Sequence, residues 1–502
     1  MTGATQGAAR REPRTVFELS APGRRASALP AAGVDAAPTE AIPASLRRKA
    51  PPRLPEVSEL DLVRHYTRLS QQNWAIDVGV YPLGSCTMKY NPKVHEEVAA
   101  LPGFRNLHPW QPEAQVQGAL QLLWEMERFL AELSGMARVT FQPAAGAQGE
   151  MTGLLMMRAF HAAAGDSRSV VLIPDSAHGT NPASVTHAGF AVRQIPSDKR
   201  GLVDLDALRA ALDPTVAGLM LTNPNTLGLF ERDIEAIAAA VHAAGGLLYF
   251  DGANFNAICG KVRPGDMGFD IVHINTHKTF TTPHGGGGPG AGPVAVSERL
   301  ERFLPTPLVG YDPGAGRWFW DDDRPDSIGR MHGFHGNFGV LVRAYTYLRS
   351  LGGEGLVRMA ERAVLNANYL RARIAEAFPA AFPGTCMHEF VATAKAYRSR
   401  GVRAMDIAKR LIDLGYHPPT VYFPLIVDEA MMAEPTETES RESLDGLAEA
   451  LLQIARETET DPELLHRAPL TTPVGRLDEA RAARQLHLRW TPGEPPLDAS
   501  GG

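Results

Sequence analysis

The sequence is poor in cysteine and aromatic residues and lacks a long uninterrupted apolar run. Its 502 residues include three cysteines and 7% aromatic residues, and the formal net charge is -6. Cys86, Cys259 and Cys386 match no zinc-ligand spacing, which favours reduced thiols in a cytoplasmic protein and predicts no metal site. The acidic balance gives no electrostatic reason to bind nucleic acid or an anionic membrane, and no segment is apolar for long enough to cross a bilayer.

The N-terminal residues 1–56 differ in composition from the rest of the chain. They are rich in alanine, proline and arginine and contain few aromatic or β-branched residues, which predicts an extended N-terminal arm. The first thirty residues hold several arginines and few acids, so an organelle transit peptide is the alternative interpretation. The absence of a convincing amphipathic helix in this segment disfavours that alternative.

From about residue 115 onward, helical patterns alternate with short apolar runs. Strands are expected at 169–173, 216–221, 247–250, 269–274 and 293–296, and helices at 116–134, 150–164, 205–212 and 231–244. This alternation predicts a mainly parallel sheet with helices on both faces.

After Gly336 the pattern changes to two long helical segments, 340–351 and 354–378, followed by short strands and further helices. We therefore expect a large α/β domain at 57–335 and a smaller C-terminal α+β domain with a tail at 336–502.

Three reactive side chains directly follow expected strands. Lys278 comes after the run 269–274, Asp251 after 247–250, and His178 after 169–173. Functional groups collect at the carboxyl ends of the strands in parallel sheets. A lysine is an unusual choice there because its charged form is costly to desolvate, and such a lysine can form an imine. The alternative for any single lysine is a side chain that extends into solvent.

The chain also offers a loop that can hold a phosphate group. Residues Gly146, Ala147 and Gln148 lead into an expected helix, whose first N–H groups can face an anion. Together with this loop, Lys278 and Asp251 are what pyridoxal 5'-phosphate requires. The lysine would hold the cofactor as an imine, and the aspartate would keep its pyridine nitrogen protonated.

Three further residues fit the same cofactor. Ala253 is small enough to lie beneath the ring, His178 can stack on the opposite face, and Thr276 can offer a hydroxyl to the phosphate. Each residue alone has an ordinary alternative, such as a helix cap for Asp251 or a loop position for His178. Their order along the chain, with βα units between them, favours the joint interpretation.

The glycine block near residue 285 needs a separate test. Gly285, Gly287 and Gly290 formally satisfy the dinucleotide-binding spacing G-x-G-x-x-G. However, Pro289 interrupts the block, and residues 293–296 resemble a strand where the motif requires a helix. This context argues against a nicotinamide or flavin site.

Motifs along nearly the whole chain resemble those of one enzyme family. They are VFELSAPGRR (16–25), YPLGSCTMKYNPK (81–93), QPAAGAQGE (142–150), IPDSAHGTNPAS (173–184), TNPNTLGLFE (222–231), DGANFNA (251–257), HINTHKTFTTPHGGGGPG (273–290), MHEFV (387–391), HPPTVYFPL (417–425) and EPTETE (434–439). The chain resembles the pyridoxal-phosphate-dependent glycine decarboxylases, the P-proteins of the glycine cleavage system, in the subunit-2 branch of the two-subunit form. The resemblance implies fold type I, the aspartate-aminotransferase-like fold.

The resemblance also implies a reaction. Glycine would lose carbon dioxide, and its aminomethyl group would pass to the lipoyl arm of the H-protein. The expected assembly is a cytoplasmic heterotetramer with two copies of subunit 1. Lys278 would carry the cofactor, Asp251 would pair with the pyridine nitrogen, His178 would stack on the ring, and Gly146 with Ala147 would bind phosphate. Gln148 departs from the histidine common in the two-subunit branch.

Substrate contacts are less well defined by the sequence. Asn225, Asn254 and His284 are candidates for binding the glycine carboxylate, and Cys86 is a candidate for the lipoyl path, although a buried unreactive thiol fits as well. Two alternative functions stay open. One is another fold-type-I enzyme, an aminotransferase or amino-acid decarboxylase acting on free substrates. The other is a non-catalytic scaffold for a partner subunit.

Overall fold

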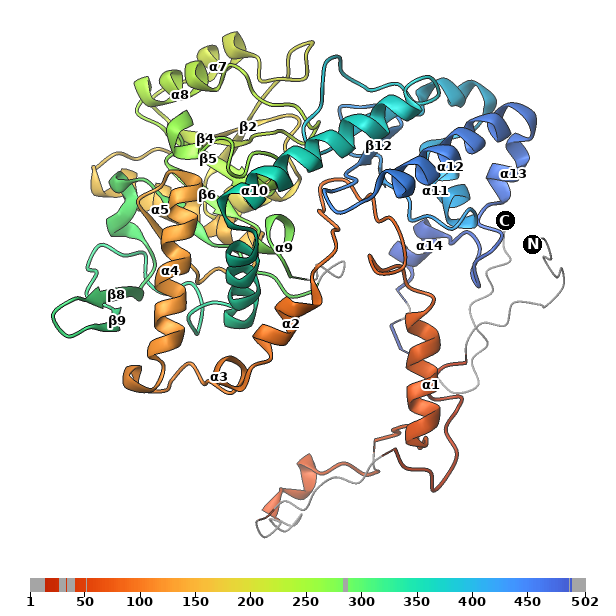
Figure 1. The fold of residues 1–502 in the computed structure, drawn as a ribbon, viewed down its shortest axis with the longest axis horizontal. Coiled ribbons are helices and arrows are strands. Elements are labelled where there is room, and N and C mark those ends of the chain that lie inside the picture. Colours follow the sequence, from red (N-terminus) through yellow and green to blue (C-terminus); the bar gives the residue numbers. More distant parts are fainter. Residues whose placement is uncertain are drawn as a thin grey trace. The chain divides into compact units, whose positions relative to one another are not determined.

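The computed structural model describes residues 14–26, 33, 41–50, 52–282, 288–486 and 488–489 (Figure 1). The chain forms two compact units: one joins the segment up to Ala75 with the segment from Pro469, and the other is Ile76–Ala468. Within the described ranges, no helix is both long and apolar enough to cross a membrane.

The described part of the first unit contains two α-helices, α1 (Glu59–Ser70) and α14 (Glu479–Arg484). Ser58 caps α1 by accepting a hydrogen bond from the Asp61 N–H. Much of the predicted arm 1–56 lies outside the described residues. Its described part includes one short 3-10 helix, Ala44–Leu46. The domain boundaries expected near residues 56 and 335 stay a prediction.

A seven-stranded sheet in the order β1-β7-β6-β5-β4-β2-β3 is the centre of the second unit. The strands are β1 (Arg138–Thr140), β2 (Val170–Pro174), β3 (Ala191–Ile195), β4 (Val216–Thr222), β5 (Leu247–Gly252), β6 (Ile271–Ile274) and β7 (Val294–Val296). Strands β2 to β6 pair in parallel, and β7 runs antiparallel to both β1 and β6. The prediction of a mainly parallel sheet is confirmed.

Helices cover both faces of this sheet. They are α4 (Gln117–Ser134), α5 (Gly146–Ala163), α6 (Thr180–His187), α7 (Leu205–Ala211), α8 (Ile234–Ala243) and α10 (Phe338–Ile374). Leu219 and Phe250 share one apolar cluster with α4, α7, α8 and α10, whereas Met220 and Tyr249 share another with α5 and α6. Alternate strand residues point to opposite faces, so both faces are buried, as predicted.

The C-terminal part of the second unit is smaller and has α+β composition. It contains the antiparallel sheet β10-β12-β11, made of β10 (Phe390–Thr393), β11 (Thr420–Val421) and β12 (Ala430–Ala433), with helices α11 (Ala404–Asp413), α12 (Arg441–Thr460) and α13 (Pro462–Arg467). The remaining elements are α2 (Lys93–Ala99), α3 (Pro102–Arg105), α9 (Thr276–Thr279) and the hairpin β8 (Leu308–Asp312) with β9 (Arg317–Asp321).

Two helices have boundaries that differ from the predicted ones. The segments 340–351 and 354–378 form one helical run, α10, interrupted at Gly352 with φ 61° and ψ -177°; in Figure 1 this run extends from beside α4 towards α12. The helix predicted at 231–244 begins at Ile234 instead. Glu231 is buried in the preceding turn, where its carboxylate accepts the Val203 N–H.

Helix α5 lies close to the sheet because its inward face carries glycine. A Cβ added at Gly153 would lie 2.3 Å from Tyr249 Cε2 and 2.8 Å from Ile271 Cγ2. One turn earlier, a Cβ at Gly149 would lie 3.3 Å from His273 Cβ. These glycines set the distance between α5 and strands β5 and β6, which carry Asp251 and His273.

We expect Gly153→Ala to lower the free energy of unfolding by about 1–3 kcal/mol, the usual cost of overpacking a filled core. Gly118→Ala is the matched control, because Gly118 is an exposed helical glycine whose added Cβ would meet nothing within 4 Å. That change should raise stability by up to about 1 kcal/mol. Urea denaturation measures the free energy of unfolding of both variants. Equal changes in the two variants would show that stability does not depend on the close approach of α5 to the sheet.

Candidate active site

Lys278 lies in the short helix α9, directly after the carboxyl end of β6. Its side chain is half-buried, and Nζ donates a hydrogen bond of 2.9 Å to the Ser85 carbonyl. Ser85 belongs to a segment nearly two hundred residues earlier in the chain. The amine is therefore held inside the protein instead of extending into solvent.

Asp251 lies on β5, opposite His273 in the parallel register with β6. It is buried and accepts hydrogen bonds from Asn181 Nδ2 (2.9 Å) and the Ala253 N–H (3.0 Å). His273 Nε2 lies 3.2 Å from its Oδ1. Burial acts to raise the pKa of Asp251, but His273, Asn181, Ala253 and Lys278 together hold that pKa below its ordinary value. Asp251 is thus a buried anion.

His273 is a functional neighbour that the sequence interpretation missed. It is buried, and burial lowers its pKa. Its Nδ1 lies 3.0 Å from the Tyr249 hydroxyl, which in turn lies 3.2 Å from the Gly149 carbonyl of α5. This chain of polar groups fixes the ring of His273 against Asp251. A histidine inside an otherwise apolar strand next to the Asp251 strand was the available signal.

His178 lies in the loop between β2 and α6 and is half-buried. Burial and the nearby Lys278 lower its pKa, while Asp251 opposes this shift. The ring is therefore neutral near pH 7. Its Nδ1 lies 3.0 Å from Thr180 Oγ1, and Thr180 Oγ1 lies 2.9 Å from Glu150 Oε1. The structure thus brings Lys278, Asp251 and His178 within electrostatic reach of one another.

The predicted anion loop is the start of α5, which begins at Gly146. The first N–H groups of a helix have no partner within the helix and attract anions. A Cβ at Gly146 would lie 2.3 Å from Asn275 Oδ1, so this helix start packs directly against the turn that carries Lys278. The oxygen Asn275 Oδ1 is buried without a hydrogen-bond partner among the described residues.

Two side chains predicted to bind the cofactor are engaged in local contacts. Gln148 Oε1 accepts the Ala144 N–H (2.7 Å), and its Nε2 donates to the Met331 carbonyl (2.9 Å). The Thr276 hydroxyl donates to the Ala291 carbonyl (3.1 Å). Gln148 and Thr276 thus shape the loop and the turn. Three residues on from Thr276, the buried Thr279 Oγ1 has no hydrogen-bond partner among the described residues.

The candidate substrate contacts lie in different environments. Asn254 is buried and donates to the Pro224 carbonyl (3.1 Å) and to Glu389 Oε1 (3.3 Å). Asn225 closes its own turn, since its Oδ1 accepts two backbone N–H groups and its Nδ2 donates to the Gly201 carbonyl. His284 lies outside the described residues, as do glycines 285–287 of the glycine block.

Cys86 is half-buried beside Ser85. Burial raises the pKa of its thiol, and Lys278 partly opposes this shift. Cys86, Cys259 and Cys386 form no disulfide. The thiol of Cys86 is therefore protonated near pH 7, within the field of Lys278.

A strap formed by residues 85–89 contacts the Lys278 turn through hydrogen bonds that no local sequence pattern predicts. The Ser85 N–H donates to Glu389 Oε2 (2.7 Å), and Thr87 Oγ1 donates to Glu434 Oε1 (2.6 Å). Lys89 Nζ, buried in an ion pair with Glu437 (2.9 Å), donates to the Thr279 carbonyl (2.6 Å). The strap thus links the Lys278 turn to the C-terminal part of the unit.

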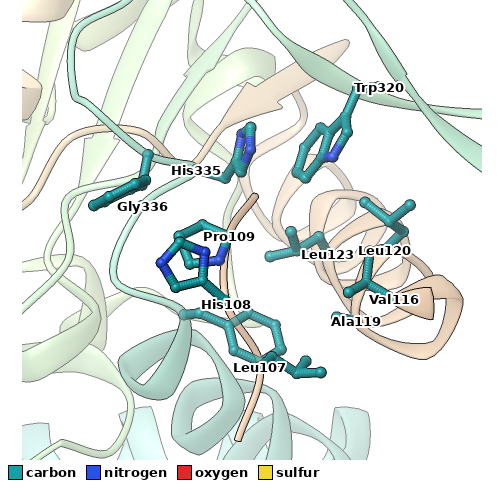
Figure 2. A pocket seen from close by; sticks show the side chains of 12 residues that line it. Leu107, His108, Pro109, Val116, Ala119, Leu120, Leu123, Trp320, His335 and Gly336 are labelled. Atoms are coloured by element: carbon teal, nitrogen blue, oxygen red, sulfur yellow. The ribbon is translucent and has the colours of Figure 1, made fainter. Parts of the chain in front are cut away.

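A separate apolar hollow has a volume of about 190 Å³ (Figure 2). Its lining is Leu107, His108, Pro109, Val116, Ala119, Leu120, Leu123, Trp320, Phe334, His335, Gly336 and Phe338. The rings of Trp320 and His335 stack with centroids 3.7 Å apart. The next residue after Gly336, Asn337, donates to the Ala144 and Gly290 carbonyls. The hollow therefore adjoins the segment that supports the start of α5.

Comparison with known proteins matches two family models to the chain. The family described as glycine cleavage system P-protein matches residues 26–315, and glycine dehydrogenase, C-terminal domain, matches residues 359–464.

Curated relatives extend this match over most of the chain. A protein of Caldanaerobacter subterraneus subsp. tengcongensis named probable glycine dehydrogenase (decarboxylating) subunit 2 is 57% identical, covering 95% of this chain and 98% of the relative. A protein of the same name from Halalkalibacterium halodurans is 58% identical, covering 95% and 97%.

Solved structures confirm the fold. An inhibitor-bound glycine decarboxylase (P-protein) of the glycine cleavage system superposes with a TM-score of 0.70 at 24% identity, covering 82% of this chain and 93% of that one. Glutamate decarboxylase of Lactobacillus brevis superposes with a TM-score of 0.62 at 14% identity, covering 84% and 97%. The predicted fold type I is thereby confirmed, and the chain belongs to the glycine cleavage system P-protein family.

Proposed function

We propose that this chain is the catalytic subunit 2 of a two-subunit glycine decarboxylase. It removes the carboxyl group of glycine as carbon dioxide and transfers the aminomethyl group to the lipoyl arm of the H-protein. The observation that carries the proposal is the set Lys278, Asp251 and His178 at the carboxyl ends of β6, β5 and β2 of one parallel sheet, in a chain 57% identical to a named relative over 95% of its length.

The residues of the site fit pyridoxal 5'-phosphate. The start of α5 offers unpaired N–H groups to a phosphate, and Asp251 offers a buried anion to a protonated ring nitrogen. Thr279 Oγ1 and Asn275 Oδ1 are buried polar atoms that still need partners. Lys278 would hold the cofactor as an imine, and His178 would lie against its ring. When bound, the cofactor accepts the electrons released by bond cleavage at the substrate α-carbon.

The protein's own side chains contribute in distinct ways. Anionic Asp251 favours a proton on the ring nitrogen, and hydrogen bonds from Asn181 and the Ala253 N–H keep the carboxylate in place. Because His178 is neutral, it can pack against a ring without repelling Lys278. The Ser85 carbonyl orients the Lys278 amine. Buried walls around these groups keep water away and strengthen each electrostatic contact.

Two alternatives make different demands on the same site. A scaffold has no use for a half-buried lysine placed near a buried aspartate, so the intact pair supports catalysis. An aminotransferase or decarboxylase of free amino acids would use the same pair but would need no lipoyl protein. A requirement for the lipoyl protein therefore distinguishes glycine decarboxylase from an enzyme that acts on free amino acids.

Replacement of Lys278 by alanine tests the lysine assignment. The variant should lose the visible absorbance of the bound cofactor and lose glycine–bicarbonate exchange by a factor on the order of 10²–10⁴, because one side chain both holds the cofactor and moves protons. Lys199→Ala, at an exposed lysine, is the control and should keep both. Retention of absorbance and exchange in Lys278→Ala would refute the assignment.

Reconstitution tests the two-subunit proposal. The purified chain should be yellow but inactive in lipoyl-protein-dependent carbon dioxide exchange, and a mixture with subunit 1 should restore activity. Equal turnover of free amino acids without a lipoyl protein would instead support a different fold-type-I enzyme. Colourless protein that never binds the cofactor would support the scaffold.

A further inference from the structure

Two buried glutamates face each other at one end of the small sheet. In the antiparallel pair β10–β12, Phe390 lies opposite Ala433. Continuing that register by one residue places Glu389 opposite Glu434. Both side chains are 0% exposed, and carboxylate oxygens of the two, with a ring nitrogen of His388, all lie within 4.8 Å of one another. We call Glu389 and Glu434 the carboxyl pair.

The carboxyl pair accepts hydrogen bonds from neutral donors. Glu389 accepts from the Ser85 N–H (2.7 Å) and Asn254 Nδ2 (3.3 Å), and Glu434 Oε1 accepts from Thr87 Oγ1 (2.6 Å) and Asn256 Nδ2 (3.2 Å). Glu434 Oε2 is buried without a hydrogen-bond partner among the described residues. A glutamine could satisfy the same donors, so these contacts alone do not require two acids.

Lys278 is the cation that acts on the carboxyl pair. Its Nζ donates to the carbonyl of Ser85, whose N–H binds Glu389. Among the other nearby groups, burial lowers the pKa of His388 to about 3, Cys86 is a thiol, and the charges of Lys89 and Glu437 are paired with each other. Lys278 therefore faces two acids.

Two buried carboxylates at this distance cannot both ionise cheaply, because desolvation and mutual repulsion add. Burial raises the pKa of Glu434 to about 7, and burial together with Glu434 raises the pKa of Glu389 well above its ordinary range. One shared proton gives the pair a single negative charge. That charge balances the ammonium of Lys278.

We propose that Glu389 and Glu434 share one proton and that the single negative charge of the pair is the counter-charge of the Lys278 ammonium. The inference rests on the proposed function in one respect, that Lys278 is the reactive amine.

Infrared spectroscopy of the full-length chain, stripped of cofactor, tests the shared proton at pH 7. The wild type should show the carbonyl stretching band of a protonated carboxyl group from the pair. Glu389→Gln and Glu434→Gln should each remove that same band, because the remaining carboxyl keeps the opposing Lys278 ammonium and loses the second acid that repels its charge. If each single substitution leaves the other acid's band in place, the two acids titrate independently and the proposal is overturned.

Glu231→Gln is the matched control. Glu231 is also buried, with its pKa raised to about 7 by burial, but it binds the Val203 N–H and Asn225. This substitution should remove only its own band and leave the band of the carboxyl pair. Loss of the pair's band in Glu231→Gln would show that the band was wrongly assigned and would also overturn the proposal.

A second measurement tests the counter-charge and does not depend on glycine turnover. Acetylation of Lys278 in the cofactor-free chain, read by mass spectrometry against the exposed Lys199, reports how reactive the amine is. In the double variant Glu389→Gln/Glu434→Gln, relative labelling at pH 7 should rise about tenfold, because the opposing negative charge that favours the ammonium is gone. Equal rates of Lys278 acetylation in the wild type, the two single variants and the double variant would refute the counter-charge. If the infrared and labelling results are as expected but the chain fails in glycine–bicarbonate exchange, only the proposed function is refuted.

Discussion

The cost of burying charge governs the arrangement of this site. The charge of Lys278 acts on two sources of negative charge, Asp251 in the large sheet and the carboxyl pair at one end of the small sheet. A buried charge without compensation costs several kcal/mol, so each ionisable group here needs its neighbours. The same low dielectric environment that makes the arrangement costly strengthens every electrostatic contact inside it.

The fold meets this demand by bringing distant segments to one place. The parallel strands β5 and β6 end side by side and deliver Asp251 and His273 in register. The strap at residues 85–89 then connects the Lys278 turn to β10 and β12 through backbone, hydroxyl and ammonium groups. As a result, the position of the Lys278 amine depends on both the seven-stranded and the three-stranded sheet of the second unit.

Close packing of α5 against the sheet supports the same geometry. Gly149 and Gly153 allow the helix to lie near Tyr249 and His273, and Gly146 brings its first N–H groups against the Lys278 turn. The helix therefore positions an anion site at one end while its body fixes the His273–Asp251 contact. Gln148, which departs from the family's common histidine, uses its amide to hold this helix start to Met331.

The sequence by itself determined the fold class and the strand-end positions of Lys278, Asp251 and His178, because hydrophobic periodicity and turn residues are local signals. It did not reveal the edge strand β3, whose residues are largely exposed, or the engaged amide of Gln148. Only the tertiary structure decided that Glu389 meets Glu434 and that the strap holds Lys278. These contacts join residues far apart in sequence, and their pairing depends on strand register and burial, which no local pattern records.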